Sequence, residues 1–108
     1  MKSRQWEIDY RTKPNYAIQN NIAAAIELLV KEMGGEILES KGWNGKMSKK
    51  LATFCGYTNF REGSIVFTGK RDIAIELEDM IKKNKNILSY RLLPLSLYNK
   101  RRLYHVEP

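Results

Sequence analysis

Apolar and polar residues alternate along the first segment of the chain. Trp6, Ile8 and Tyr10 fall on one side, and Glu7 and Asp9 fall on the other. This period of two is typical of a strand with one buried and one wet face. We therefore predict a strand over residues 5–12, and Pro14 ends it.

Two later segments carry apolar residues at helical spacing. Asn15 is suited to cap the first helix, and Gly34 and Gly35 stop it because glycine takes the left-handed conformation without a Cβ clash. Asp72 is expected to cap the second helix. The predicted inward stripes are Ile18, Ile22, Ile26, Leu29, Val30 and Met33 in the first helix, and Ile73, Leu77, Met80 and Ile81 in the second.

Three further strands complete the predicted fold. One begins at Glu36 and fades near Lys41, where residues 42–45 have the composition of a turn. The others cover residues 64–68 and about 87–93. This order predicts an α+β, ferredoxin-like βαββαβ sandwich, a four-stranded antiparallel sheet with two helices on one face. We assign residues 1–95 to this domain and residues 96–108 to a basic C-terminal extension.

Charge favours nucleic acid as the partner. The chain has 108 residues, enough for one compact domain, and a formal net charge of +7. Such a surplus on a small surface attracts polyanions, although it can also serve solubility alone. The single cysteine, Cys55, excludes an internal disulfide and favours a reducing compartment. We expect no membrane span, because no apolar run is long enough.

The basic residues gather in two segments of the sequence, which are the candidate sites for binding nucleic acid. Residues 41–61 contain five basic residues and no acidic residue, and residues 100–102 form a second basic cluster, close to Tyr104. Flexible cations can reach phosphates, and a tyrosine ring can stack on a base. The alternatives are a solvated loop and a tail that only aids solubility.

Other residues offer weak catalytic signals. His105 stands alone, Cys55 has no second ligand near it in sequence for a metal, and Glu7 with Asp9 is more simply a polar sheet face.

Trp43 is expected to pack over the end of the sheet. Arg91 can join the polar face, but the pattern of the last strand leaves its side undecided.

Several motifs in order resemble the bacterial-type small-subunit ribosomal protein S-six family. Arg4-Gln5-Trp6-Glu7 resembles the family's first strand, and Gly34-Gly35-Glu36-Ile37 resembles the junction between its first helix and second strand. The later motifs are Trp43, Gly45, Lys46, Lys49, Lys50, Leu51 and Ala52, then a strand led by Gly63, and then Asn86-Ile87-Leu88-Ser89-Tyr90. The resemblance covers residues 4–93. The sequence departs from the family at Thr53-Phe54, which replaces Tyr-Pro, and in a longer loop.

This resemblance implies a structural ribosomal protein without catalysis, cofactor or small-molecule substrate. It implies binding to the central-domain platform of small-subunit rRNA beside ribosomal protein S-eighteen and other small-subunit proteins. The departures suggest a mitochondrial ribosome, with the bacterial cytoplasm and the plastid as alternatives. The predicted RNA-binding residues are Arg4, Lys46, Lys49, Lys50, Arg61, Arg91, Lys100, Arg101 and Arg102.

Three rival functions use the same order of elements. An RNA-recognition motif needs alternating aromatic residues on its third strand, and residues 62–67 supply only Phe67. An acylphosphatase-like enzyme needs a glycine-rich, arginine-bearing first loop, which residues 12–15 lack. A regulatory domain that binds a small molecule is the third alternative, and we would expect it to dimerise through its sheet without affinity for RNA.

Overall fold

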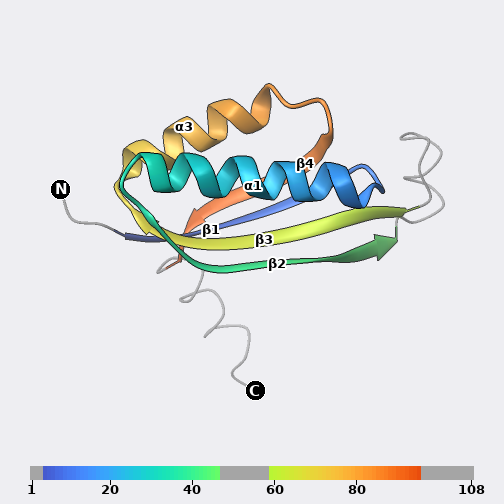
Figure 1. Ribbon diagram of the computed structural model, residues 1–108, viewed down its shortest axis with the longest axis horizontal. Coiled ribbons are helices and arrows are strands. Elements are labelled where there is room, and N and C mark those ends of the chain that lie inside the picture. Colours follow the sequence, from blue (N-terminus) through green and yellow to red (C-terminus); the bar gives the residue numbers. More distant parts are fainter. Residues whose placement is uncertain (1–3, 47–58, 96–108) are drawn as a thin grey trace, which may run out of the picture.

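The computed structural model describes residues 4–46 and 59–95, and these form one sheet and two helices (Figure 1). The strands have the order β2-β3-β1-β4, and every neighbouring pair is antiparallel. This arrangement confirms the predicted ferredoxin-like βαββαβ fold. The elements are β1 (Arg4–Thr12), α1 (Tyr16–Glu32), β2 (Glu36–Lys46), β3 (Asn59–Gly69), α3 (Arg71–Lys82) and β4 (Ile87–Pro94).

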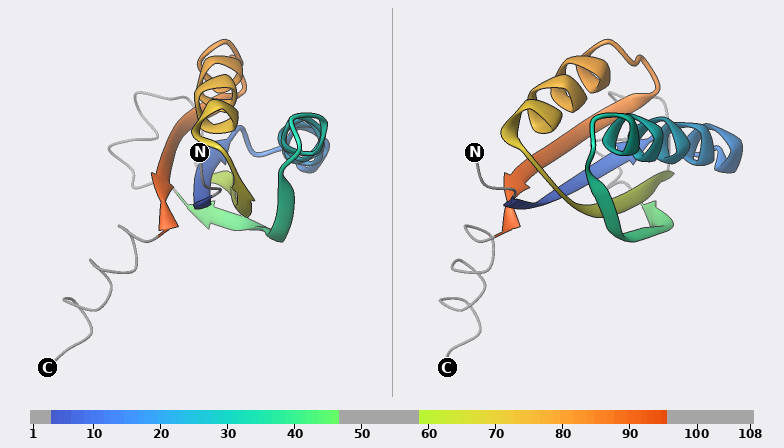
Figure 2. Two further views of the ribbon diagram at one scale, coloured as in Figure 1. Left: turned by 90° about the vertical axis from the view of Figure 1, so that its left-hand side faces the viewer. Right: turned by 60° about the vertical axis from the view of Figure 1, so that its left-hand side comes forward.

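Both helices pack on one face of the sheet, and no described helix or strand covers the other face (Figures 1 and 2). We call these the covered face and the open face. The alternation along β1 decides which residues lie on each, because successive side chains of a strand point to opposite sides. Trp6, Ile8 and Tyr10 are buried, as predicted, whereas Glu7 and Asp9 are only partly buried.

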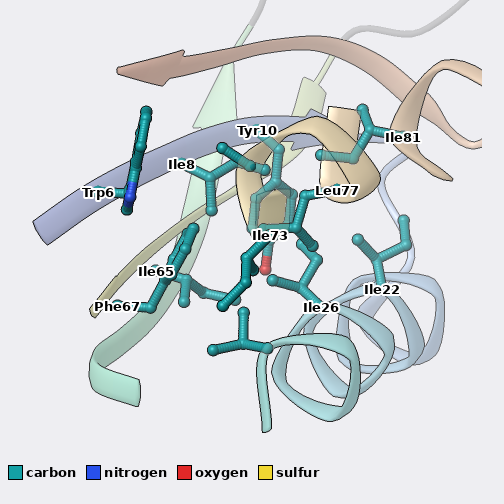
Figure 3. Close-up of a cluster of buried hydrophobic side chains, with 12 residues drawn as sticks. Trp6, Ile8, Tyr10, Ile22, Ile26, Ile65, Phe67, Ile73, Leu77 and Ile81 are labelled. Carbon is teal, nitrogen blue, oxygen red and sulfur yellow. The ribbon is translucent and has the colours of Figure 1, made fainter. Parts of the chain in front are cut away.

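The core fills the space between the covered face and the helices (Figure 3). Ile8 of β1 and Phe67 of β3 meet Ile26 of α1 and Leu77 of α3 in one cluster, and each of these four is 0% exposed. Burying a large apolar side chain stabilises a fold by roughly 1.5–3 kcal/mol. The amphipathic stripes read from the sequence therefore build the layer that holds the sheet and helices together. Met33 is the exception: α1 ends at Glu32, and Met33, predicted to face inward, is 38% exposed.

Three helix ends show how local chemistry sets these boundaries. The Asn15 side chain accepts a hydrogen bond from the Ile18 amide at 3.1 Å, which confirms the predicted cap of α1. Gly34 follows the C-terminus of α1 with a φ of 85°, as its role as a stop signal requires. The prediction for α3 was wrong: its N-cap is Lys70, without a side-chain bond, and Asp72 lies within the first turn. There its carboxylate still complements the helix dipole.

The predicted turn at residues 42–45 was also wrong, because β2 continues through it to Lys46. Gly42 pairs with Gly63 across the ladder, and a Cβ at Gly42 would collide with the side chain of Gln19 from α1. This glycine therefore provides space for close packing and not a turn. The next strand likewise begins at Asn59 and not at Ser64, so the predicted basic loop of residues 41–61 is partly strand. Residues 47–58 lie outside the described part.

Candidate nucleic-acid interface

The predicted RNA-binding residues within the described ranges lie at three separate places. Arg4 begins β1 and pairs with Gly69, whereas Lys46 ends β2 at the opposite end of the sheet. Arg61 lies on β3 near that second end, and Arg91 lies in the middle of β4. The remaining five predictions fall outside the described residues and stay predictions: Lys49, Lys50, Lys100, Arg101 and Arg102.

Arg61 is held by three elements at once. Its Nε donates a hydrogen bond to Gln19 Oε1, and its Nη1 donates one to Asn44 Oδ1 at 2.7 Å. The guanidinium also lies over the Tyr16 ring, 5.0 Å from its centroid. Arg61 therefore joins α1, β2 and β3, and only its remaining N–H donors are left for a phosphate. Its role in RNA binding stays a prediction.

Gln19 is the residue of this network that the sequence reasoning missed. It is 3% exposed, and its Nε2 donates to the backbone carbonyl of Glu62 while its Oε1 accepts from Arg61. A signal was present, because Gln19 lies three residues before Ile22 and seven before Ile26, on the buried stripe of α1. A polar residue on such a stripe indicates a buried hydrogen-bonding position.

Arg91 lies on the open face, which resolves the choice that the sequence left undecided. It is the ladder partner of Asp9, and its Nη2 lies 3.2 Å from Asp9 Oδ2. The side chain of Arg91 is 55% exposed and that of Asp9 is 32% exposed. Its charge is thus already close to a carboxylate, which distinguishes it from a cation that waits for a phosphate.

The open face is hollowed into a groove of about 850 Å³ in which charges of both signs alternate. Arg11 pairs with Glu62 at 2.9 Å, and Lys41 pairs with Glu39. In a chain with a net charge of +7, the described residues that line this groove include no surplus of cations. The charged residues that line the groove are Glu7, Asp9, Glu39 and Glu62, with Arg11, Lys41 and Arg91.

Trp43 gives the groove an aromatic wall. Its indole Nε1 donates to Glu62 Oε2, while Glu62 Oε1 accepts from Arg11 Nε at 2.9 Å. The tryptophan is 42% exposed on the open face, so the expectation that it packs over the end of the sheet was wrong. Leu38 lines the same groove at a bulge in β2 and is 47% exposed. A ring fixed at its polar edge and open elsewhere is well suited to contact a partner.

Residues 4–46 and 59–95 contain no group of three or more His, Cys, Asp or Glu side chains arranged to hold a metal ion. Neither helix in these ranges combines the length and the apolar composition that crossing a membrane requires.

Comparisons with known proteins show the fold. No protein-family model and no curated protein matches the sequence. The 30S ribosomal protein S6 from Thermotoga maritima superposes with a TM-score of 0.74 at 17% identity, over 96% of this chain and 99% of that protein. An uncharacterized protein from the same organism gives a TM-score of 0.58 at 12% identity, over 87% of this chain and 99% of that protein.

A third similar structure belongs to another functional class. The ACT domain from the GTP pyrophosphokinase of Chlorobium tepidum gives a TM-score of 0.53 at 13% identity, over 85% of this chain and 100% of that domain. The fold of this chain is therefore a ferredoxin-like fold of the type seen in ribosomal protein S6. At these identities the likeness extends to the fold alone, and a shared fold does not define a function.

Proposed function

We propose that this protein is a structural constituent of the small ribosomal subunit that binds rRNA and a neighbouring ribosomal protein. The observation that carries the proposal is the similarity to 30S ribosomal protein S6, which spans 96% of this chain with the same order of elements. Within the described residues, the motifs that resemble the S-six family follow the same order: they lie on β1, at the junction of α1 and β2, on β2, on β3 and at the start of β4. The proposed location on a mitochondrial ribosome stays a prediction.

The distribution of charge supports a role in RNA binding. Six of the 19 basic residues but only one of the 12 acidic residues belong to the segments 1–3, 47–58 and 96–108. Most of the surplus positive charge therefore belongs to segments outside the described residues. We assign the contacts to phosphates to the segment after Lys46 and to the basic extension, because such contacts depend on cations and not on a shaped pocket. The assigned cations are Lys49, Lys50, Lys100, Arg101 and Arg102, together with Lys46 and Arg61 on the two strands that flank the first of these segments.

The open face is assigned to the protein partner. Its paired charges offer RNA little net attraction, and its carboxylates would repel phosphates. A protein surface with complementary charges suits it better, with Trp43 as a fixed aromatic contact at the centre of recognition. On the ribosome, that partner would be ribosomal protein S-eighteen or another small-subunit protein beside it.

Co-sedimentation with small ribosomal subunits at moderate salt tests the proposal. We expect the protein to pellet with the subunits, and the variant Lys49→Ala with Lys50→Ala to be released at lower salt. If about four cations neutralise phosphates, the logarithm of the affinity should fall with the logarithm of salt with a slope of about −3. A protein that stays in the supernatant at every salt concentration would refute the ribosomal assignment.

The partner face needs its own test. Trp43→Ala should weaken binding to ribosomal protein S-eighteen by tenfold or more, on the order expected for an aromatic hot spot. Leu28→Ala is the matched control, since Leu28 is also an exposed apolar residue, at 58%, but lies on α1. Equal effects of both substitutions would remove the open face from the interface.

The ACT-domain similarity keeps one alternative worth measuring. A regulatory domain that binds a small molecule would form dimers through its sheet and would show no affinity for RNA. Sedimentation velocity of the purified protein with and without RNA separates the two functions.

An acylphosphatase-like enzyme has its own test. Measurable acyl phosphate hydrolysis that disappears in Arg11→Ala would favour that function.

A further inference from the structure

Two connections that are far apart in sequence lie side by side at one end of the sheet. The segment from β1 to α1 contains Lys13, and the segment from α3 to β4 contains Lys85. The Lys13 amide donates to the Asn86 carbonyl at 3.1 Å, and Thr12 is the ladder partner of Ile87. In Figure 1 this is the right-hand end, where β2 also ends and β3 begins.

Hydrogen bonds fix the backbone of Lys13 and of the residues that flank Lys85. The Lys13 carbonyl accepts from the Asn15 amide at 2.7 Å and from Thr12 Oγ1 at 3.0 Å. Around Lys85, the Ile87 amide donates to the Asn84 carbonyl at 3.2 Å, and the Asn86 amide donates to Asn84 Oδ1 at 2.9 Å. Lys85 is exposed within this closed turn. Both side chains therefore project from rigid positions.

No acidic residue of the two connections offsets the charges of Lys13 and Lys85. The neighbouring Lys82 and Lys83 already form ion pairs with carboxylates of α3, Lys82 with Glu78 at 3.1 Å and Lys83 with Asp79 at 3.0 Å. The ion pairs among the described residues include neither Lys13 nor Lys85. Neither connection contains an acid, and the first turn of α1 has none to offset the positive end of its dipole.

We propose that Lys13 and Lys85 form a phosphate-binding pair that contacts the backbone of RNA. This inference deepens the proposed function and rests on it. Neighbouring strands are about 4.8 Å apart, so two flexible lysine stems on adjacent strand ends can contact adjacent phosphates of one RNA strand. Such contacts position the RNA without reading its sequence. They also lie at the end of the sheet from which the segment after Lys46 departs.

Fluorescence anisotropy with a labelled RNA hairpin from the central domain of small-subunit rRNA tests the pair. Lys13→Ala with Lys85→Ala should lower the affinity about tenfold near 0.1 M salt and reduce the steepness of the salt dependence by roughly 1.5. Lys70→Ala with Arg71→Ala is the matched control. It removes the same charge from exposed positions at the opposite end of the sheet and should leave the salt slope unchanged.

The outcomes separate this inference from the function on which it rests. If the wild-type protein does not bind the hairpin, the proposed RNA binding itself fails. If it binds and both double variants weaken binding equally, only net charge matters, and the assignment to Lys13 and Lys85 is wrong. Thermal unfolding verifies that both variants fold. Lys85→Glu alone, at an exposed turn position, provides a second test should Lys13→Ala lower stability, and its affinity should fall below that of the wild type.

Discussion

The two faces of the sheet are made by the same four strands, yet they differ in almost every physical respect. The covered face buries Ile8, Ile65 and Phe67 at 0% exposure against the helices. The open face holds exposed ion pairs and the half-exposed Trp43 around a groove. The pleat alone separates them, because adjacent residues of one strand point to opposite sides. Stability therefore depends mainly on the covered face, and the open face is available for the proposed contact with a partner protein.

The largest effect that would sharpen this contrast is expected in the core. Phe67→Ala should lower the free energy of unfolding by about 3–5 kcal/mol, since it removes a fully buried ring and leaves a cavity. Leu38→Ala on the open face should cost less than about 1 kcal/mol, because Leu38 is already 47% exposed. Urea denaturation of both variants measures the difference. Similar losses would mean that the open face is also part of the stabilising core.

Tyr10, on the covered face, predicts how stability responds to alkaline pH. Burial raises its pKa from 10.0 to about 12, helped by the Glu27 carboxylate and opposed by the Arg61 guanidinium. The folded protein thus holds this proton more tightly than the unfolded chain. The resulting stabilisation, about 3 kcal/mol, is complete below pH 10 and is lost as the pH rises to about 12.

Phenolate absorbance and urea denaturation across this pH range test the prediction. In Tyr10→Phe the loss of stability between pH 10 and 12 should be smaller than in the wild type by that amount. An unchanged profile would show that the Tyr10 hydroxyl does not control alkaline unfolding.

How much of this molecule the sequence predicts depends on whether the deciding contacts are local. Asn15 and Gly34 mark the ends of α1 through chemistry within one turn, and both were predicted. Gly42 was wrongly predicted to be part of a turn. A glycine is needed there because the side chain of Gln19, from another element, packs against it and leaves no space for a Cβ. Local propensity competes with tertiary packing at such positions, and packing prevailed.

The same limit applies to the candidate site. Lys13 and Lys85 are far apart in sequence, and only the pairing of β1 with β4 brings their backbones together. Clusters that are contiguous in sequence, such as Lys100-Arg101-Arg102, were readily found, whereas a pair created by strand pairing was not. Trp43 was misplaced for a related reason, since its position follows from the extent of β2.

Two arginines on opposite faces allow a finer comparison with one residue type. Arg61→Ala should cost about 1–2 kcal/mol, because Gln19, at 3% exposure, would lose the donor to its Oε1 in a buried environment. Arg61→Lys keeps the charge but cannot donate to Gln19 and Asn44 in the same planar geometry, so it should recover only part of this loss. Thermal and urea unfolding of both variants measure the two effects. Full recovery by lysine would mean that charge matters at this position and geometry does not.

Arg91→Ala should have the smallest effect, at most about 0.5 kcal/mol. Its pair with Asp9 is 3.2 Å long and solvent-exposed, and the attraction in water is offset by the entropy lost in ordering both side chains. A double-mutant cycle with Asp9→Ala measures the coupling, which should shrink further at high salt. A coupling above about 1 kcal/mol that persists in salt would contradict this view. The open face would then contain an electrostatic network that stabilises the fold. A partner protein that binds there would have to break these ion pairs and would lose the stabilisation that they provide.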